Sequence, residues 1–206
     1  MKFIENIQQV AELKPDYLGF IFYERSPRNF EGIIPELPKG IKKVGVFVNE
    51  YLEIVVSLIE EYKLEAVQLH GDESVAYIKE LKQYLPKVEV IKVFGVKDEF
   101  NFEIIKPYEA VVDYFLFDTK GKERGGNGIT FNWQVLKDYN STKGYFLSGG
   151  IGLEEVGELT MFLKTSASKY CYAVDVNSKF ETKPGIKSVK KIEQFKAYCQ
   201  KLTAKS

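Results

Sequence analysis

Short apolar runs alternate with amphipathic stretches from one end of the chain to the other. The apolar runs are nearly continuous, as in residues 18–23 and 44–48, which is typical of strands that helices cover on both faces of a parallel sheet. We expect seven such strands, whose starts lie 23 to 30 residues apart. They are Asp16–Tyr23, Lys43–Asn49, Ala66–Gly71, Glu89–Val96, Tyr114–Thr119, Gly144–Gly150 and Tyr172–Ser178.

Several of the remaining segments carry apolar residues at the spacing of a helix face. We expect helices at Met1–Leu13, Tyr51–Tyr62, Ser74–Leu85 and Lys187–Leu202. Pro15 ends the first of them, because proline cannot continue a helix. No linker-like or low-complexity stretch interrupts the pattern, so we expect residues 1–206 to form a single domain.

A repeated strand–helix unit in one domain fits two architectures, an open doubly wound sheet or a (β/α)₈ TIM barrel. An open nucleotide-binding sheet carries its glycine fingerprint after the first strand, but the turn after Tyr23 reads ERSPR. The glycines cluster instead after the fifth and sixth strands, which favours the barrel. The count is one strand short, because the chain begins with a helix. We therefore expect a barrel whose first strand is missing from this chain, or one that closes differently.

Composition narrows the function classes. Lys plus Arg and Asp plus Glu number 29 each, so the formal net charge is zero and gives no reason to expect a nucleic-acid or membrane partner. The apolar runs are shorter than a bilayer span, and residues 1–9 do not resemble a signal peptide, so we expect a cytoplasmic protein. Cys171 and Cys199 are too few for a disulfide framework or a zinc site.

Asp118 is the first candidate for chemistry, at the end of the fifth strand. A carboxylate against an apolar strand is costly without a partner, and this one stands beside a loop that contains Gly125, Gly126 and Gly128. Such an acid suits proton transfer. An Asp that only caps the next turn is the alternative, and it is commoner in general.

Active sites of TIM barrels lie at the carboxyl ends of the strands. Arg28 follows the first expected strand. It could bind a planar carboxylate through two parallel hydrogen bonds, or it could be a solvated loop residue. His70 ends the third strand and is the only histidine, so any imidazole-dependent step must use it. A structural role for His70 is the slightly favoured alternative.

Two further loops predict an anion site. Gly149 and Gly150 end the sixth expected strand and let backbone N–H groups approach an anion, with the next helix adding the positive end of its dipole. Asn177 and Ser178 end the last expected strand. Because the last two loops of TIM barrels recurrently bind phosphate, we favour a phosphate site over tight turns without a ligand.

These segments together resemble the phosphoribosylanthranilate isomerase family of tryptophan biosynthesis. The matching segments are LGFIFYERSPR (18–28), VGVFVN (44–49), AVQLHGDE (66–73), FDTKGKERGGNGITFNW (117–133), LSGGI (147–151) and AVDVNSKFETKPGIKS (173–188). Each is weak alone, but the ordered set is highly specific. The resemblance implies an Amadori rearrangement of N-(5-phosphoribosyl)anthranilate to 1-(2-carboxyphenylamino)-1-deoxyribulose 5-phosphate, a TIM barrel, and no metal or organic cofactor. The oligomeric state stays open.

The resemblance also implies roles for individual residues. Asp118 matches the general acid that protonates the ribose ring oxygen, and Arg28 matches the residue that holds the anthranilate carboxylate. His70 would line the pocket. The loops at Gly149-Gly150 and Asn177-Ser178 match the phosphate cradle, and the loop of residues 125–128 would close over the substrate.

The chain departs from the family pattern in two places. Lys179 stands where a glycine is common, and it either adds charge toward the phosphate or points to solvent. The family's first strand ends in a Lys-Ile/Val-Cys-Gly segment whose cysteine is the general base, and neither Cys171 nor Cys199 is equivalent to it. We therefore expect a truncated start, low stability from two unpaired strand edges, and little isomerase activity, since losing a base costs ~10²–10⁴-fold.

Two other hypotheses compete with the isomerase. A barrel of the indole-3-glycerol phosphate synthase kind would carry a catalytic lysine and glutamate near its early strands, and no such set is present. A non-catalytic phosphosugar-binding barrel would keep Arg28, Gly149 and Gly150 but not the acid. Asp118 argues against this reading, whereas the absent cysteine argues for it.

Overall fold

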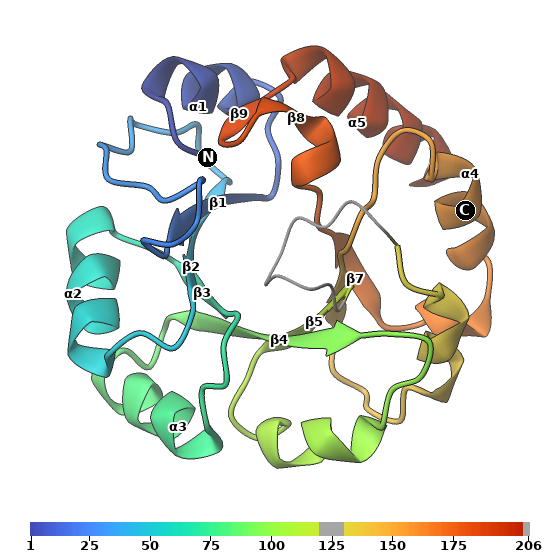
Figure 1. Cartoon of the computed structure of the whole chain (residues 1–206), viewed down its shortest axis with the longest axis horizontal. Helices are drawn as coiled ribbons and strands as arrows, with labels where there is room; N and C mark the ends of the chain where they lie inside the picture. The colour runs from blue at the N-terminus through green and yellow to red at the C-terminus, as the bar shows by residue number, and fades with distance from the viewer. Residues whose placement is uncertain (120–129, 204–206) are drawn as a thin grey trace.

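Seven parallel strands are hydrogen-bonded in chain order into one curled sheet in the computed structural model, which describes residues 1–119 and 130–203 (Figure 1). The strands are β1 (Tyr17–Phe22), β2 (Lys42–Phe47), β3 (Ala66–Leu69), β4 (Glu89–Val96), β5 (Tyr114–Thr119), β6 (Tyr145–Leu147) and β7 (Cys171–Val174). Every predicted strand is present. The structure therefore confirms the parallel barrel-like sheet that the apolar runs predicted, with one strand fewer than a closed eight-stranded barrel.

Strand ends are where prediction and structure differ most. The bounds of β4 and β5 match the prediction, but β6 ends at Leu147 rather than at Gly150. Gly149 and Gly150 have φ angles of +88° and +64°, which lie outside the extended region, so the strand stops before them.

Helices surround the sheet (Figure 1). They are α1 (Ile4–Ala11), α2 (Leu52–Tyr62), α3 (Val75–Tyr84), α4 (Val156–Phe162) and α5 (Val189–Thr203), with short 3-10 helices at Phe102–Tyr108, Trp133–Asp138, Ser166–Ser168 and Ser178–Phe180. The sequence predicted a helix after Gly150 without giving its bounds, and it did not predict the hairpin of β8 (Glu181–Lys183) and β9 (Ile186–Lys187). Both are too short to show a clear periodicity.

The two faces of the strands bury different sets of side chains, because successive residues of a strand point to opposite faces. One face packs against the helices. The other forms a small apolar cluster inside the curled sheet, made of Val44, Ala66, Ile91, Val93, Leu116 and Phe146. Continuing this alternation toward the carboxyl ends of the strands places Gln68, His70, Asp118 and Ser148 on the inner face, above the cluster.

The ring of strands is open between β1 and β7. Within the described residues these two strands are not hydrogen-bonded to each other, although α1 and α5 are in contact outside them. The carboxyl half of β1 is joined instead by its own following loop, where the Phe30 amide donates to the Ile21 carbonyl at 2.8 Å. A cavity of about 830 Å³ runs from this opening to the ends of β3, β5, β6 and β7.

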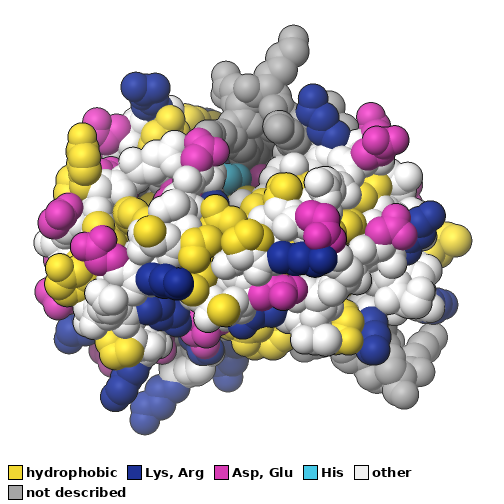
Figure 2. Space-filling view, turned by 90° about the horizontal axis from the view of Figure 1, so that it is seen from below, with side chains coloured by type: hydrophobic (Ala, Val, Ile, Leu, Met, Phe, Trp, Pro, Cys, Tyr) yellow, Lys and Arg dark blue, Asp and Glu magenta, His cyan; other side chains and the backbone are white. Residues whose placement is uncertain are grey.

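The surface shows no charge bias on the face drawn in Figure 2, where basic and acidic side chains are interspersed, as the zero formal net charge suggests. Among the helices of residues 1–119 and 130–203, none combines the length and the apolar character that crossing a bilayer requires.

Candidate active site

An imidazole and a carboxyl meet on the inner face of the sheet. His70 follows β3 and Asp118 lies in β5, and the His70 Nε2 atom lies 3.4 Å from Asp118 Oδ2. Both side chains are mostly buried, with 17% and 11% of their surface exposed. The Gln68 amide lies 3.2 Å from His70 Nδ1 and, as a donor there, leaves the proton on Nε2, facing Asp118. The Thr119 amide holds the other oxygen of Asp118 at 2.8 Å. The imidazole and the carboxyl are therefore held close to each other on the inner face of the sheet.

Asp175 is a second carboxyl of the same cavity. It follows β7, lines the cavity with His70 and Asp118, and accepts a 2.7 Å hydrogen bond from the Ser148 hydroxyl. Loss of water around it raises its pKa, and the charge of Asp118 adds to this effect. The sequence prediction gave Asp175 no role.

A buried ion pair holds the main chain on both sides of His70. Lys92 of β4 and Glu73 are 2% and 5% exposed, and Lys92 Nζ lies 3.1 Å from Glu73 Oε2. Lys92 also donates to the carbonyls of Leu69 and Gly71, at 3.2 and 2.8 Å. Glu73 in turn accepts the Gly71 amide. The peptide that carries His70 is therefore held from both ends.

The Gly149-Gly150 turn packs directly against the end of β5. A Cβ atom on Gly149 would lie 2.3 Å from Thr119 Oγ1 and 3.0 Å from Asp118 Oδ1, so only glycine fits there. The turn thus lies on the same rim as Asp118. The helix expected after it is α4, which begins at Val156, so residues 151–155 separate its N-terminus from the turn.

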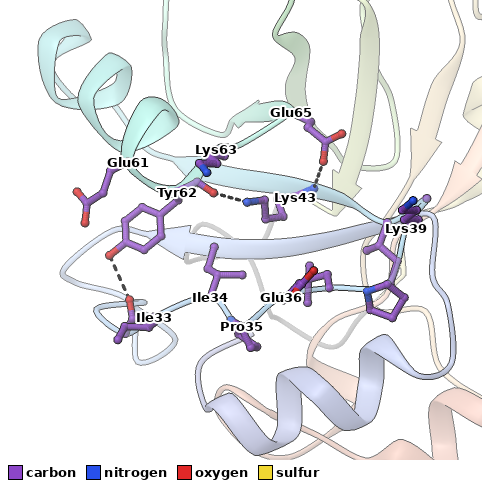
Figure 3. A pocket seen from close by; sticks show the side chains of 15 residues that line it. Ile33, Ile34, Pro35, Glu36, Lys39, Lys43, Glu61, Tyr62, Lys63 and Glu65 are labelled. Carbon is purple, nitrogen blue, oxygen red and sulfur yellow. Dashed lines mark hydrogen bonds between the residues drawn. The ribbon is translucent and has the colours of Figure 1, made fainter.

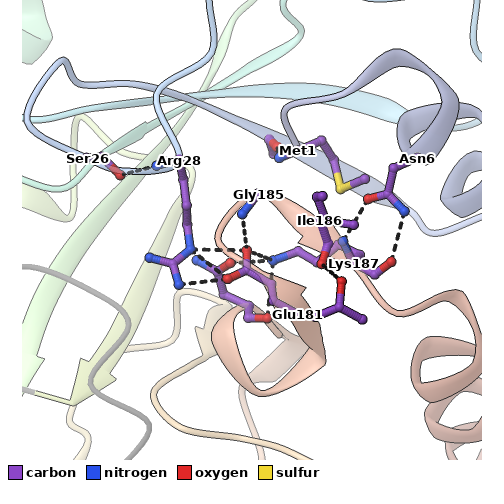
Figure 4. A network of polar contacts seen from close by, with 11 residues as sticks. Met1, Asn6, Ser26, Arg28, Glu181, Gly185, Ile186 and Lys187 are labelled. Atoms are coloured by element: carbon purple, nitrogen blue, oxygen red, sulfur yellow. Dashed lines mark hydrogen bonds and ion pairs between the residues drawn. The ribbon is translucent and has the colours of Figure 1, made fainter.

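Arg28 belongs to a polar network that connects four segments of the chain (Figure 4). Its Nε and Nη2 atoms donate to Glu181 at 2.9 and 2.7 Å, so the two-pronged partner in the structure is a residue of this chain. Glu181 also accepts from Lys187 Nζ at 2.9 Å and from the Gly185 amide at 3.1 Å. Burial would raise the pKa of Glu181, but the hydrogen bonds and charges of Arg28 and Lys187 lower it overall.

Lys187 connects this network to the predicted phosphate loop. Its ammonium group donates to the main-chain carbonyl of Asn177 at 3.1 Å and to the Asn177 side chain. Asn177 and Ser178 line the same cavity as Gly149 and Gly150. The ammonium of Lys179, the next residue, pairs with Glu155 Oε1 at 2.5 Å.

The loop with Gly125, Gly126 and Gly128 lies outside the described residues. Neither Cys171 nor Cys199 forms a disulfide, and burial raises the pKa of Cys171 to about 12, so this thiol is protonated at neutral pH. In the described part of the chain, no three His, Cys, Asp or Glu side chains gather as a metal site would need.

A second cavity, of about 670 Å³, lies at the amino ends of β2 and β3, away from Asp118 (Figure 3). Residues 32–41 form one wall, and Lys43 and Tyr62 form another. The Tyr62 hydroxyl donates to the Gly32 carbonyl at 3.2 Å, and Lys43 donates to the Tyr62 carbonyl. These contacts hold the loop of residues 32–41 and the start of β2 against α2, so we interpret them as structural.

The fold and the 830 Å³ cavity define a TIM-type barrel enzyme. Acidic groups, an imidazole and a glycine turn lie on one rim of this barrel. The chain belongs to the N-(5'-phosphoribosyl)anthranilate isomerase family, whose model matches residues 1–197. It is 37% identical, over 93% of its length and 86% of the relative's, to the N-(5'-phosphoribosyl)anthranilate isomerase of Parabacteroides distasonis.

Solved structures of the family are similar to it as well. The phosphoribosyl anthranilate isomerase of Thermus thermophilus has a TM-score of 0.81 and 26% identity, covering 98% of this chain and 96% of that one. A phosphoribosyl anthranilate isomerase in complex with reduced 1-(o-carboxyphenylamino)-1-deoxyribulose 5-phosphate has a TM-score of 0.76 and 29% identity, covering 98% and 95%. The likeness in sequence and structure spans nearly the whole chain.

Proposed function

We propose that this chain converts N-(5-phosphoribosyl)anthranilate to 1-(2-carboxyphenylamino)-1-deoxyribulose 5-phosphate in tryptophan biosynthesis, acting in the cytoplasm on a free phosphosugar. Family membership carries the proposal, and the cavity that contains His70, Asp118, Gly149 and Gly150 supports it. An acid, a carboxylate-binding arginine and an anion-binding turn around one cavity suit a substrate with a phosphate at one end and a benzoate at the other.

Asp118 is the proposed general acid. Its carboxyl protonates the ribose ring oxygen, the bond from that oxygen to C1 breaks, and the nitrogen lone pair forms the open-chain Schiff base. Removal of the C2 proton then gives an enolamine, and its tautomer is the ketose product. His70, 3.4 Å from Asp118, lines the pocket and helps hold the acid in place.

The backbone of Gly149-Gly150 and of Asn177-Ser178 is the proposed phosphate cradle. Positive φ angles at both glycines turn their main chain away from the extended form, as anion-binding turns do. Arg28 is the proposed partner of the anthranilate carboxylate. Only the Nη1 edge of its guanidinium is left for this partner, because Glu181 takes the other edge.

Neither cysteine among these 206 residues suits the role of general base in the proposed reaction. Cys171 and Cys199 are the only two, and Cys171 stays protonated because of its raised pKa. We therefore expect binding close to that of the family and turnover reduced by ~10²–10⁴-fold, the usual effect of a lost base.

The experiment supplies N-(5-phosphoribosyl)anthranilate to the purified 206-residue chain and measures product by chromatography, with binding of the reduced product analogue measured by calorimetry. Slow product formation with normal binding supports the proposal. Binding without any product above the uncatalysed rate identifies the second reading, a non-catalytic phosphosugar-binding barrel. Absence of both contradicts the proposed function.

A further inference from the structure

The guanidinium of Arg28 has two edges, and the structure uses them differently. The edge with Nε and Nη2 pairs with Glu181 through both carboxylate oxygens. The remaining nitrogen, Nη1, points away from Glu181 in Figure 4. A guanidinium can hold two carboxylates at once on its two edges, because it has five N–H donors in one plane.

Glu181 contacts Arg28 but lies outside the cavity that Arg28 lines. Arg28 and Lys187 both line the 830 Å³ cavity, whereas Glu181 does not. The Glu181 side chain is only 5% exposed, and it is held by Lys187 and by the Gly185 amide in addition to Arg28. A carboxylate in this place orients the arginine without occupying the space that a ligand would take.

Lys187 extends the same cluster to the other end of the cavity. Its ammonium has three protons, and within the described residues it donates to Glu181, to the main-chain carbonyl of Asn177 and to the side chain of Asn177. The main chain of Lys187 is itself fixed, since its amide and carbonyl form a reciprocal pair with the side chain of Asn6 at 2.7 and 2.8 Å. One buried cluster therefore ties Arg28 to the Asn177-Ser178 loop.

We propose that Glu181 and Lys187 are positioning residues that fix the span between the free edge of Arg28 and the Asn177-Ser178 main chain, and that this span selects phosphosugars that carry an aromatic carboxylate. The proposal rests on the proposed function for the identity of the ligand. It adds the residues that set the distance between the ligand's two charged ends.

The competing explanation is that Glu181 blocks Arg28 and leaves it when substrate binds. The two explanations predict opposite changes in the affinity for a carboxylate ligand when Glu181 is replaced. If Glu181 orients Arg28, its loss weakens the binding of a carboxylate ligand. If Glu181 competes for Arg28, its loss removes a negative charge from the site and strengthens that binding.

The test compares two ligands by calorimetry. One is reduced 1-(o-carboxyphenylamino)-1-deoxyribulose 5-phosphate, and the other is the same molecule without the carboxylate. Glu181→Gln is expected to weaken the first at least ~10-fold, as loss of a buried charge partner does, and to change the second less than ~3-fold. Lys187→Met, which also releases Asn177, is expected to weaken both.

Glu155→Gln is the matched control, because Glu155 forms an ion pair with Lys179 near the same loop but touches neither Arg28 nor Asn177. It is expected to change neither affinity more than ~3-fold. Equal or tighter binding of the carboxylate ligand to Glu181→Gln overturns the proposal, and so does an equal loss for both ligands. If the unmodified chain binds neither ligand, the proposed function fails instead.

Discussion

His70 and Asp118 meet across the inner face of the sheet, with Nε2 of the imidazole 3.4 Å from Oδ2 of the carboxyl. They come from strands that are not neighbours, since β4 lies between β3 and β5. Only a strongly curled sheet brings these two ends together. The pair is therefore a product of the fold and cannot arise from local sequence.

Replacing Asp118 by Asn tests the proposed acid. Asn keeps the shape and accepts the Thr119 amide, but it cannot donate a carboxyl proton to the ring oxygen. We expect product formation to fall a further ~10²–10⁴-fold, with the affinity for the reduced product analogue nearly unchanged. Asp113→Asn, at the residue directly before β5 and paired with Lys82, is the control and should leave product formation intact. Equal turnover by both variants would remove Asp118 from the mechanism.

Lys92→Met tests the buried pair beneath His70. The change leaves the Glu73 carboxylate unpaired in a site that is 5% exposed, so the free energy of unfolding should fall by about 3–5 kcal/mol in urea titrations. The double variant with Glu73→Gln should recover part of this loss. Lys82→Met removes a more exposed pair with Asp113 and should cost less than about 1 kcal/mol. Similar losses for the two single variants would contradict the account.

Asp175→Asn should change the pH dependence of stability. The folded-state pKa of Asp175 is raised, mainly by burial, so folding favours its protonated form. Asp175 therefore stabilises the folded state below its ordinary pKa of about 3.9, and this stabilisation is lost as the pH rises through its folded-state pKa. An Asn side chain cannot ionise, so the variant does not lose stability in this way, and its amide oxygen still accepts the Ser148 hydroxyl. Urea titrations between about pH 3 and pH 7 should show the variant gaining on the parent as pH rises; a constant difference would be inconsistent with the raised pKa.

Gly149→Ala tests the close contact between the glycine turn and β5. The φ angle of +88° and the 2.3 Å approach to Thr119 Oγ1 both oppose a methyl group. We expect a loss of about 1–3 kcal/mol in the free energy of unfolding and weaker phosphate binding. Gly157→Ala, in α4 with open space around its Cβ position, should be neutral or stabilising by about 0.5–1 kcal/mol. If both substitutions behaved alike, the contact would not matter.

Much of the fold could be predicted from the sequence, because each strand is a compact apolar run between polar segments. Both β4 and β5 were found with their bounds. The bounds of α4 and the whole β8–β9 hairpin were not predicted, because elements of seven residues or fewer are too short to show a clear periodicity. The end of β6 was missed because the two glycines that follow it continue the apolar run but not the backbone conformation.

The candidate site was only half visible in the sequence. His70, Asp118 and the glycine turn could be found because parallel strands place their carboxyl ends on one rim. Glu181 and Lys187 could not, because their role depends on contacts with Arg28 and Asn177 that span 153 and 10 residues of chain. Lys92 was hidden for a similar reason, since a lysine in a strand gives no sign of a buried partner.

The most direct test of the central claim is a crystal structure of the chain with reduced 1-(o-carboxyphenylamino)-1-deoxyribulose 5-phosphate. The account predicts that the phosphate binds to main-chain N–H groups at Gly150 and Ser178, that the carboxylate binds to the free edge of Arg28, and that the sugar oxygens face Asp118. A ligand bound at the amino ends of the strands, or with its phosphate on Arg28 and its aromatic ring at the glycine turn, would contradict it.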